Sequence, residues 1–391
     1  MTVPRISNDH SRRKSSNLEA HGDGSEHNDH DKEKPHGTAS PEGKTPSFNH
    51  EKQKMHKRYL NLLKEEFLKL YKNPIEYEKS PDEFDVIKTI GAGAFGTVFL
   101  VRDTISFYYY AMKTMEKSAI VQKKVVRQII REKKVLQALS FPFVVPLEFT
   151  SKDNGYVYFV VPFEAGGELY TLIKNTGALP EAWSQFYAAQ MVLALEYLHH
   201  CCVVHRDVKP ENILINASGY IKLVDFGFCK IIKTRTWTLC GTPEYIAPEI
   251  IMGKGYSYTV DWWSLGVLIF EMSTGYPPFY GANRAKLYDK ILIGKFKTPE
   301  TMSKITKSII RHFLEVDPTK RYGSLKTGGY DIKSHAWFHE TNWDGILHQK
   351  DIPPYIPVCK DLADTTNFTS RSEAKLKSYA QPVFEDEFAD F

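Results

Sequence analysis

The chain has 391 residues, of which 42% are hydrophobic, and its formal net charge at pH 7 is only +4. This length exceeds what one hydrophobic core usually serves, and the apolar content is sufficient for two packed lobes with tails. So small a charge disfavours nucleic-acid binding as the main activity, because that activity normally needs a concentrated basic face.

The cysteines and the apolar stretches indicate where in the cell the protein is expected to lie and whether it spans a membrane. Five cysteines, at positions 201, 202, 229, 240 and 359, form no pair with metal-ligand spacing, and the chain starts without an apolar signal core. We therefore expect a reducing, intracellular location in the cytoplasm, with the nucleus as a second site. The longest apolar stretch, Trp262 to Met272, is interrupted by polar residues and shorter than the roughly 20 residues of a spanning helix, so it predicts a buried helix and no membrane span.

Residues 1–50 nearly lack large apolar side chains and are predicted to be a disordered arm. Many histidines in this arm could indicate metal capture, but their irregular spacing favours a solvated tail without zinc. The next segment, 51–74, is predicted to be an amphipathic helix docked on the folded core, ended by Asn73-Pro74. Its apolar residues recur at helical spacing: Leu60, Leu63, Phe67, Leu68 and Tyr71.

The remaining chain divides into two lobes and a tail. Residues 84–161 indicate a small, mostly β lobe, 162–167 a hinge, 168–338 a larger helical lobe, and 339–391 a tail over the folded core. The elements predicted within the lobes are strands at 86–90, 98–101 and 108–113 and helices at 123–139, 183–198 and 260–274.

Two motifs in the middle of the chain carry groups suited to phosphoryl transfer. They are His205-Arg206-Asp207-Val208-Lys209-Pro210-Glu211-Asn212 and, one short strand later, Asp225-Phe226-Gly227. Asp207 can accept a proton from an attacking hydroxyl, and Lys209 can neutralise charge on the transferring group. Asn212 and Asp225 can hold Mg²⁺ against nucleotide phosphates. Together the motifs resemble those of the eukaryotic protein kinases, which implies an α+β, bilobal fold and a catalytic domain over 84–338.

A glycine-rich run between two predicted strands is the candidate ATP-phosphate loop. Glycines let backbone amides approach phosphate oxygens closely. A dinucleotide-binding fold would place a helix directly after this loop, whereas here a strand follows and leads to Lys113. Lys113 could be an ordinary strand lysine, but Glu132 offers an ion-pair partner that would fix it on the α- and β-phosphates. The loop residues predicted to bind nucleotide are Gly91, Ala92, Gly93, Ala94, Phe95 and Gly96.

The kinase resemblance implies roles for further residues. Four apolar residues match those that sandwich adenine, with ordinary core packing as the alternative: Val98, Ala111, Leu169 and Leu214. A phosphate on Thr238, added by an upstream kinase or by the chain itself, would lie near Arg206 and Lys230. Structural roles are implied for Thr242 with Asp207 and Lys209, for Glu249 with Arg321, and for Asp261 beneath the catalytic loop.

A narrower resemblance covers residues from about 67 to 368. Arg235-Thr236-Trp237-Thr238-Leu239-Cys240-Gly241-Thr242-Pro243-Glu244-Tyr245, Val260-Asp261-Trp262-Trp263 and Gly275-Tyr276-Pro277-Pro278-Phe279 are similar to runs in catalytic subunits of cyclic-AMP-dependent protein kinases, in the AGC group. The resemblance implies a serine/threonine kinase that prefers arginine upstream of the target. The matching residues are the carboxylates Glu168, Glu211 and Glu271 and the apolar residues Leu239, Pro243 and Ile246. It also implies an inhibitory cyclic-AMP-binding regulatory subunit that contacts Trp237.

The chain departs from this family in several places. Gln128 replaces a histidine expected to contact the activation-loop phosphate, so that coupling is expected to weaken or to pass through Arg127 or Arg131. The tail after Phe368 lacks the usual tyrosine and acidic run, but Phe388-Ala389-Asp390-Phe391 keeps the two-phenylalanine spacing that docks on the small lobe. In the arm, Arg12-Arg13-Lys14-Ser15 reads as a hypothetical substrate of the chain's own site, with a solvated basic run as the alternative.

Two other functions stay open at this stage. A pseudokinase scaffold would usually have lost one of four residues that are intact here: Lys113, Asp207, Asn212 and Asp225. Another AGC kinase, not governed by a cyclic-AMP regulatory subunit, is the second alternative, because of the divergent tail and long arm.

Overall fold

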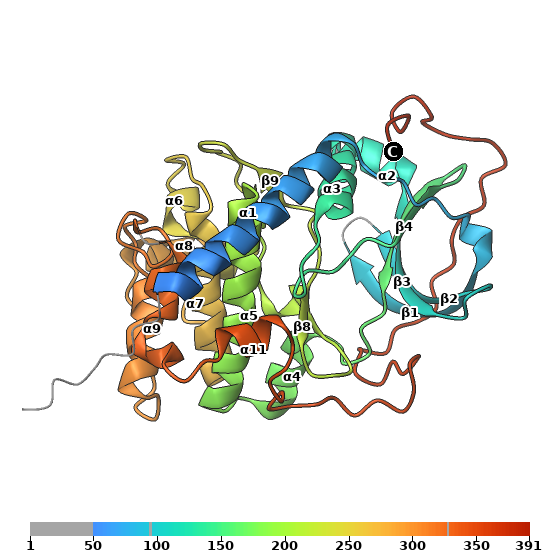
Figure 1. The fold of residues 1–391 in the computed structure, drawn as a ribbon. Helices are drawn as coiled ribbons and strands as arrows, with labels where there is room; N and C mark the ends of the chain where they lie inside the picture. Colours follow the sequence, from blue (N-terminus) through green and yellow to red (C-terminus); the bar gives the residue numbers. More distant parts are fainter. Residues whose placement is uncertain (1–49, 94–95, 327) are drawn as a thin grey trace, which may run out of the picture. The chain divides into compact units, whose positions relative to one another are not determined.

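The computed structural model describes residues 50–93, 96–326 and 328–391. The predicted arm with Ser15, and the loop residues Ala94 and Phe95, lie outside the described residues. A β-rich lobe and a larger helical lobe are seen in Figure 1, so the predicted α+β bilobal fold is confirmed.

Five antiparallel strands form the sheet of the small lobe, in the order β1-β2-β3-β5-β4. Their bounds are β1 Phe84–Gly93, β2 Gly96–Asp103, β3 Tyr109–Glu116, β4 Phe149–Lys152 and β5 Tyr156–Pro162. The register sets Val98 of β2 opposite Lys113 of β3, which brings the glycine turn next to the lysine. Gly96 must lack a side chain, because an added Cβ would collide with the carbonyl of Thr114.

Two helices follow the third strand, and the second of them matches the helix that the sequence predicted over 123–139. They are α2 (Lys117–Gln122) and α3 (Val126–Ala138). Lys124 interrupts the helical path with a φ of 57°, a left-handed conformation that a continuing α-helix cannot contain. The predicted helix therefore corresponds to α3, which begins three residues later than expected and buries Glu132, whereas α2 was not predicted.

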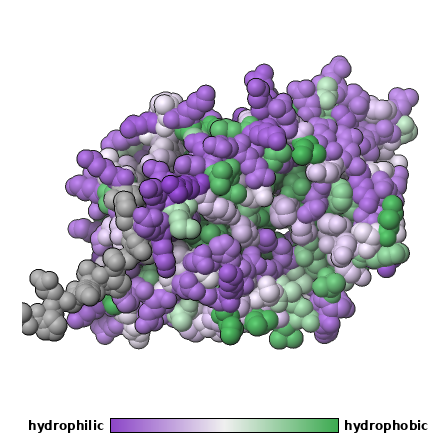
Figure 2. All heavy atoms as spheres, in the orientation of Figure 1, coloured by the Kyte–Doolittle hydropathy of each residue, from purple (hydrophilic) through white to green (hydrophobic). Residues whose placement is uncertain are grey.

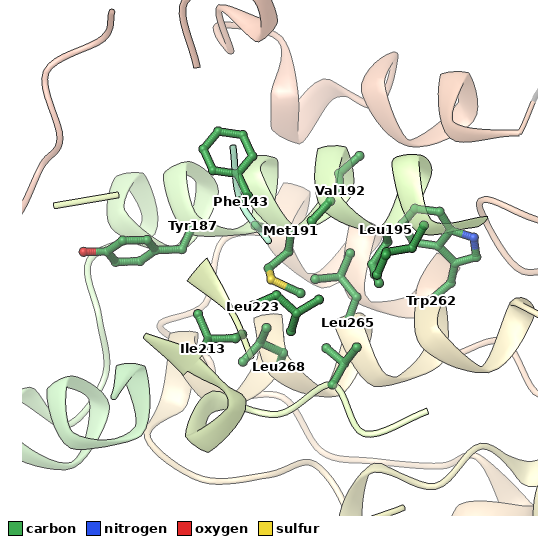
Figure 3. Close-up of a cluster of buried hydrophobic side chains, with 14 of the residues drawn as sticks. Phe143, Tyr187, Met191, Val192, Leu195, Ile213, Leu223, Trp262, Leu265 and Leu268 are labelled. Atoms are coloured by element: carbon green, nitrogen blue, oxygen red, sulfur yellow. The ribbon is translucent and has the colours of Figure 1, made fainter. Parts of the chain in front are cut away.

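The core of the larger lobe lies around α5 (Glu181–His200) and α7 (Thr259–Thr274). Both helices are apolar on nearly all sides, as expected of helices that lie inside a domain. Figure 3 shows Met191 and Leu195 of α5 gathered with Leu265 and Leu268 of α7. The larger lobe also contains four short strands, which form the pairs β6-β9 and β7-β8. They are β6 Val203–Val204, β7 Ile213–Ile215, β8 Ile221–Leu223 and β9 Lys230–Ile231.

The other helices of the described larger lobe surround this centre. They are α4 Leu169–Thr176, α6 Pro248–Ile251, α8 Arg284–Ile293, α9 Lys304–Phe313, α10 Gly329–Lys333 and α11 Trp343–Leu347. The glutamate and arginine predicted to pair are both buried here: Arg321 donates to Glu249 through Nη1 at 2.7 Å and Nη2 at 2.9 Å. This two-pronged ion pair ties α6 to the segment that follows α9.

The first helix, α1 (His50–Lys72), packs against α3 and α5, as the blue ribbon in Figure 1 shows. Leu60 and Phe67 are buried. Leu68, which the spacing grouped with them, is 52% exposed, so that assignment was wrong. One step along a helix rotates the side chain by about 100°, which carries Leu68 off the face that Phe67 occupies.

The tail returns to the small lobe and ends there, where Figure 1 marks the C-terminus near α2. Phe388 and Phe391 are buried in an apolar cluster, and Phe391 stacks on Phe159 with 5.5 Å between ring centroids. Lys152 Nζ donates to the carbonyl oxygen of Phe388 at 2.8 Å. The last residues therefore dock on the lobe that the phenylalanine spacing indicated.

The outer surface is mostly hydrophilic on the face in Figure 2, with scattered hydrophobic residues. Among the helices of the described ranges, none combines the length and apolar character needed to cross a bilayer. All five cysteines are free.

Candidate active site

Lys113 lies between two carboxylates that come from different parts of the chain. Its Nζ is 2.9 Å from Glu132 Oε1 of α3 and 3.1 Å from Asp225 Oδ1. Burial opposes a charge on Lys113, but the two carboxylates outweigh burial and raise its pKa. The same lysine is the main cause of the lowered pKa of Asp225, whereas burial raises the pKa of Glu132 against its attraction. The positive charge of Lys113 is thus held on the strand next to β2, which follows the glycine turn.

Asp207 is buried and its carboxylate is fixed by several donors. Oδ2 lies 2.9 Å from both Lys209 Nζ and Asn212 Nδ2. Oδ1 accepts from the backbone N of Thr242 at 3.0 Å and from its Oγ1 at 2.8 Å. Thr242 Oγ1 in turn accepts from Lys209 Nζ at 2.9 Å. The threonine, lysine and aspartate that the family resemblance grouped therefore meet, and the carboxylate has one defined orientation.

A buried acid on α7 anchors the loop that carries Asp207. Arg206 has a φ of 70°, which is strained for a residue with a side chain. Asp261 accepts from the backbone N of His205 at 3.0 Å and of Arg206 at 2.8 Å, and its Oδ2 is 2.8 Å from Nε2 of His199. These bonds fix the backbone of the strained turn. His199, at the end of α5, was not selected from the sequence, because nothing in its local pattern marks it.

Asn212 and Asp225 lie close together because they flank the antiparallel strands β7 and β8. The backbone N of Val224 donates to the carbonyl oxygen of Asn212 at 2.9 Å, which places Asp225 next to the asparagine. Among the described hydrogen bonds the Asn212 side chain uses only Nδ2, so Oδ1 remains for a ligand. An amide oxygen beside an ionised carboxylate is a donor set that fits Mg²⁺.

The predicted adenine residues are only partly brought together. Val98 and Ala111 share one apolar cluster with Phe163 of the hinge and Phe368 of the tail. Leu214 lies on β7, half-buried, and pairs across to Glu168 through an isolated bridge. Leu169 does not join them: it is fully buried in the core of the larger lobe, as the first residue of α4.

Leu169 thus lies apart from the other residues predicted to sandwich adenine, whereas Phe368 of the tail, which was not predicted for this role, lies with Val98 and Ala111. Phe368 stacks on Phe163 with 5.3 Å between ring centroids. In the sequence, Phe368 is marked only as an aromatic residue at the end of the region that resembles the family. Of the glycine loop, Gly91, Ala92, Gly93 and Gly96 lie at the junction of β1 and β2.

Three cations gather under the activation segment. Burial lowers the pKa of Lys230, and the charges of Arg206 and Arg131 lower it further, which indicates that both arginines lie near enough to repel this lysine. Thr238 is exposed, and its carbonyl oxygen accepts from Tyr256 Oη at 2.5 Å. Arg206 Nη1 also donates to this tyrosine, at 3.1 Å. The cation cluster is therefore linked to the segment that carries Thr238.

Gln128 of α3 contacts the second motif directly. Its Nε2 donates to the carbonyl oxygen of Gly227 at 2.5 Å. The side chain is therefore occupied with the Asp-Phe-Gly turn, while Arg131 of the same helix is the residue whose charge acts on Lys230. Of the two alternatives weighed from the sequence, Arg127 and Arg131, this favours Arg131.

Carboxylates gather on the larger lobe beside Asp207. Burial raises the pKa of Glu168, and the charge of Glu211 raises it further. Burial also raises the pKa of Glu271, which accepts a hydrogen bond from Tyr245, with smaller contributions from Glu211 and from a residue not selected in the sequence, Glu244. Carboxylates whose pKa is raised by burial and by a neighbouring negative charge form a site that favours a cation.

The three apolar residues predicted to line a pocket differ in exposure. Leu239 is 63% exposed, Pro243 is half-buried, and Ile246 is buried in the core of the larger lobe. Their common pocket stays a prediction.

Comparisons with known proteins identify the family. A model of the protein kinase domain matches residues 84–338. The chain is 46% identical over 296 residues to "cAMP-dependent protein kinase catalytic subunit 3" of Drosophila melanogaster, covering 76% of this chain and 51% of the fly protein. It is 43% identical over 297 residues to "cAMP-dependent protein kinase catalytic subunit PRKX" of Mus musculus, covering 76% and 84%.

A Dictyostelium discoideum protein, "cAMP-dependent protein kinase catalytic subunit", is 43% identical over 303 residues, covering 78% of this chain and 47% of its own. The chain thus spans about half the length of the fly and Dictyostelium relatives. The chain belongs to the protein kinase family, and within it to the group of cAMP-dependent protein kinase catalytic subunits.

Asp261→Asn is expected to loosen the catalytic loop. The asparagine keeps one carbonyl oxygen but turns an NH₂ group toward a backbone donor, which costs about 1–3 kcal/mol of unfolding free energy. Urea denaturation measures that loss, and kcat is expected to fall with it. Asp344→Asn, whose side chain is 75% exposed, is the matched control. Equal stability of the two variants would contradict the anchoring role.

Proposed function

We propose that the chain transfers the γ-phosphate of ATP to serine or threonine hydroxyls of proteins. This proposal rests mainly on the two hydrogen bonds by which Asn212 connects Asp207 with the segment that carries Asp225. The Asn212 side chain binds the Asp207 carboxylate, and its backbone binds Val224, next to Asp225 and so to Lys113. A proton acceptor, a cation-binding pair and a phosphate-binding lysine are thus contiguous. All four residues whose loss would mark a pseudokinase are in place, which disfavours the scaffold alternative.

The chain's own residues contribute mainly positioning and charge. Lys113, held by Glu132, would bind the α- and β-phosphates of ATP, and backbone amides of the glycine loop would approach the phosphate oxygens. Asp207 would orient the substrate hydroxyl and accept its proton, while Lys209 would offset charge on the transferring group. Asn212 and Asp225 would hold Mg²⁺, which supplies charge neutralisation at the phosphates when bound.

The protein substrates proposed are basic sequences. The charge of Glu211, which is exposed, raises the pKa of half-buried Glu168 and of buried Glu271, in both cases after burial itself. A guanidinium would offset these negative charges through paired, charge-assisted hydrogen bonds. Serine or threonine preceded by arginine at two and three positions upstream is therefore the proposed target.

Phosphorylation of Thr238 is the proposed activating event. Arg131, Arg206 and Lys230 form a cation cluster that a phosphate would neutralise. Since Arg131 lies on the same helix as Glu132, ordering of the activation segment would also hold the glutamate that pairs with Lys113. The phosphate could come from an upstream kinase or from the chain itself.

Inhibition by a cyclic-AMP-binding regulatory subunit is proposed from the names of the relatives and from one exposed surface. Trp237 is 66% exposed and Leu239 is 63% exposed, and both belong to the activation segment. Large exposed apolar residues at this place suit a protein partner. An AGC kinase without such a partner is the alternative.

Asp207→Ala is expected to lower kcat by a factor of about 10²–10⁴ while ATP affinity changes little. The reason is that this carboxylate would touch the hydroxyl and not the nucleotide. Steady-state phosphorylation of an arginine-containing serine peptide and nucleotide binding by calorimetry measure the two quantities. Equal loss of both would contradict the assigned role.

A recombinant regulatory subunit of a cAMP-dependent kinase is expected to inhibit the chain, and cyclic AMP is expected to restore activity. Trp237→Ala should weaken that inhibition at least about tenfold, as expected when a central aromatic contact is removed. Tyr280→Ala, also at an exposed aromatic residue, serves as the control. Activity that is indifferent to the regulatory subunit would favour the alternative.

A further inference from the structure

The tail crosses from the hinge to the small lobe within a few residues. On the hinge side, Asn367 Nδ2 donates to the carbonyl oxygen of Ala165 at 3.0 Å. Gly167 lies so close to Asn367 that an added Cβ would collide with it. On the small-lobe side, Glu373 Oε2 accepts from the backbone N of Thr89 on β1 at 2.9 Å and from its Oγ1 at 3.0 Å. Residues 368–372 are therefore held at both ends.

Arg371 belongs to this held segment and carries an exposed guanidinium. Glu168 comes directly after Gly167, the residue that Asn367 covers. The positive charge of Arg371 opposes the rise in the pKa of Glu168 that burial and Glu211 cause. The tail thus brings a cation of the chain itself to a carboxylate assigned above to a substrate arginine.

The other cation that acts on Glu168 is already engaged. Lys209 Nζ lies 2.9 Å from Asp207 Oδ2 and donates to Thr242 Oγ1 at 2.9 Å. Within the described part of the chain, Arg371 makes no ion pair or hydrogen bond at contact distance, so no other group holds its guanidinium away from the glutamate. Arg371 is thus the adjustable charge at this carboxylate.

We infer that Arg371 is a specificity-determining residue: it serves as an intramolecular counter-ion to Glu168 and competes there with the upstream arginine of the substrate. The inference rests on the proposed function. A substrate arginine must displace or approach a like charge, which weakens its binding at the carboxylate. Substrates without that arginine do not meet this competition. The tail therefore reduces the difference in KM between substrates with and without the upstream arginine.

Arg371→Ala is expected to lower KM about two- to fivefold for a serine peptide with arginine three positions upstream, and to leave KM unchanged for the matched alanine peptide. Arg371→Lys keeps the charge and should stay close to the unmodified chain. Lys375→Ala removes another exposed tail cation and is the control. Since exposed charges are screened, the difference between Arg371→Ala and the unmodified chain should shrink as salt is raised to about 1 M.

Two outcomes would overturn the inference. One is a KM for the arginine peptide that is unchanged or higher in Arg371→Ala, and the other is an equal change for both peptides. Glu168→Gln separates this failure from failure of the proposed function. If Glu168→Gln abolishes the arginine preference while Arg371→Ala has no effect, only the role of Arg371 is lost. If the unmodified chain shows no arginine preference, the proposed substrate class itself fails.

Discussion

The ion pair of Lys113 with Glu132, extended to Asp225, is the interaction on which the rest of the structure depends. It joins a strand of the small lobe to α3 and then to the larger lobe. Glu132 is buried, so without Lys113 it would be an uncompensated charge, which costs several kcal/mol, about 3–5. Its other carboxylate oxygen, Oε2, is buried without a hydrogen-bond partner in the described chain. The lysine therefore stabilises the fold and presents a positive charge to phosphates.

The tail completes the site. Phe368 adds an aromatic wall beside the hinge, and Glu373 binds β1. Further on, Tyr379 donates a hydrogen bond to Glu116, to which Lys377 is also paired at 2.9 Å. Each contact lies on the small lobe or the hinge. Because the tail is bound to the small lobe and the hinge while Glu168 belongs to the larger lobe, closure of the two lobes would change the distance between Arg371 and Glu168.

The sequence predicted those parts of the site that are contiguous in the chain. The motifs around Asp207 and Asp225 each specify chemistry within a few residues, and the pairing of Glu249 with Arg321 followed from family resemblance. Several features that depend on long-range packing were not predicted. The burial of Leu169 and the stacking of Phe368 are decided by neighbours far away in sequence. Glu244 and His199 have no local signal, because their partners are set by the tertiary fold.

The central claim is that Lys113 serves phosphoryl transfer to a protein hydroxyl. The most direct measurement is transfer of labelled γ-phosphate from ATP to an arginine-containing serine peptide, by the intact chain and by Lys113→Met, with folding checked by circular dichroism. The account predicts transfer by the intact chain and a loss of at least about a hundredfold in a variant that remains folded. Equal rates from the two proteins, or no transfer by the intact chain, would contradict it.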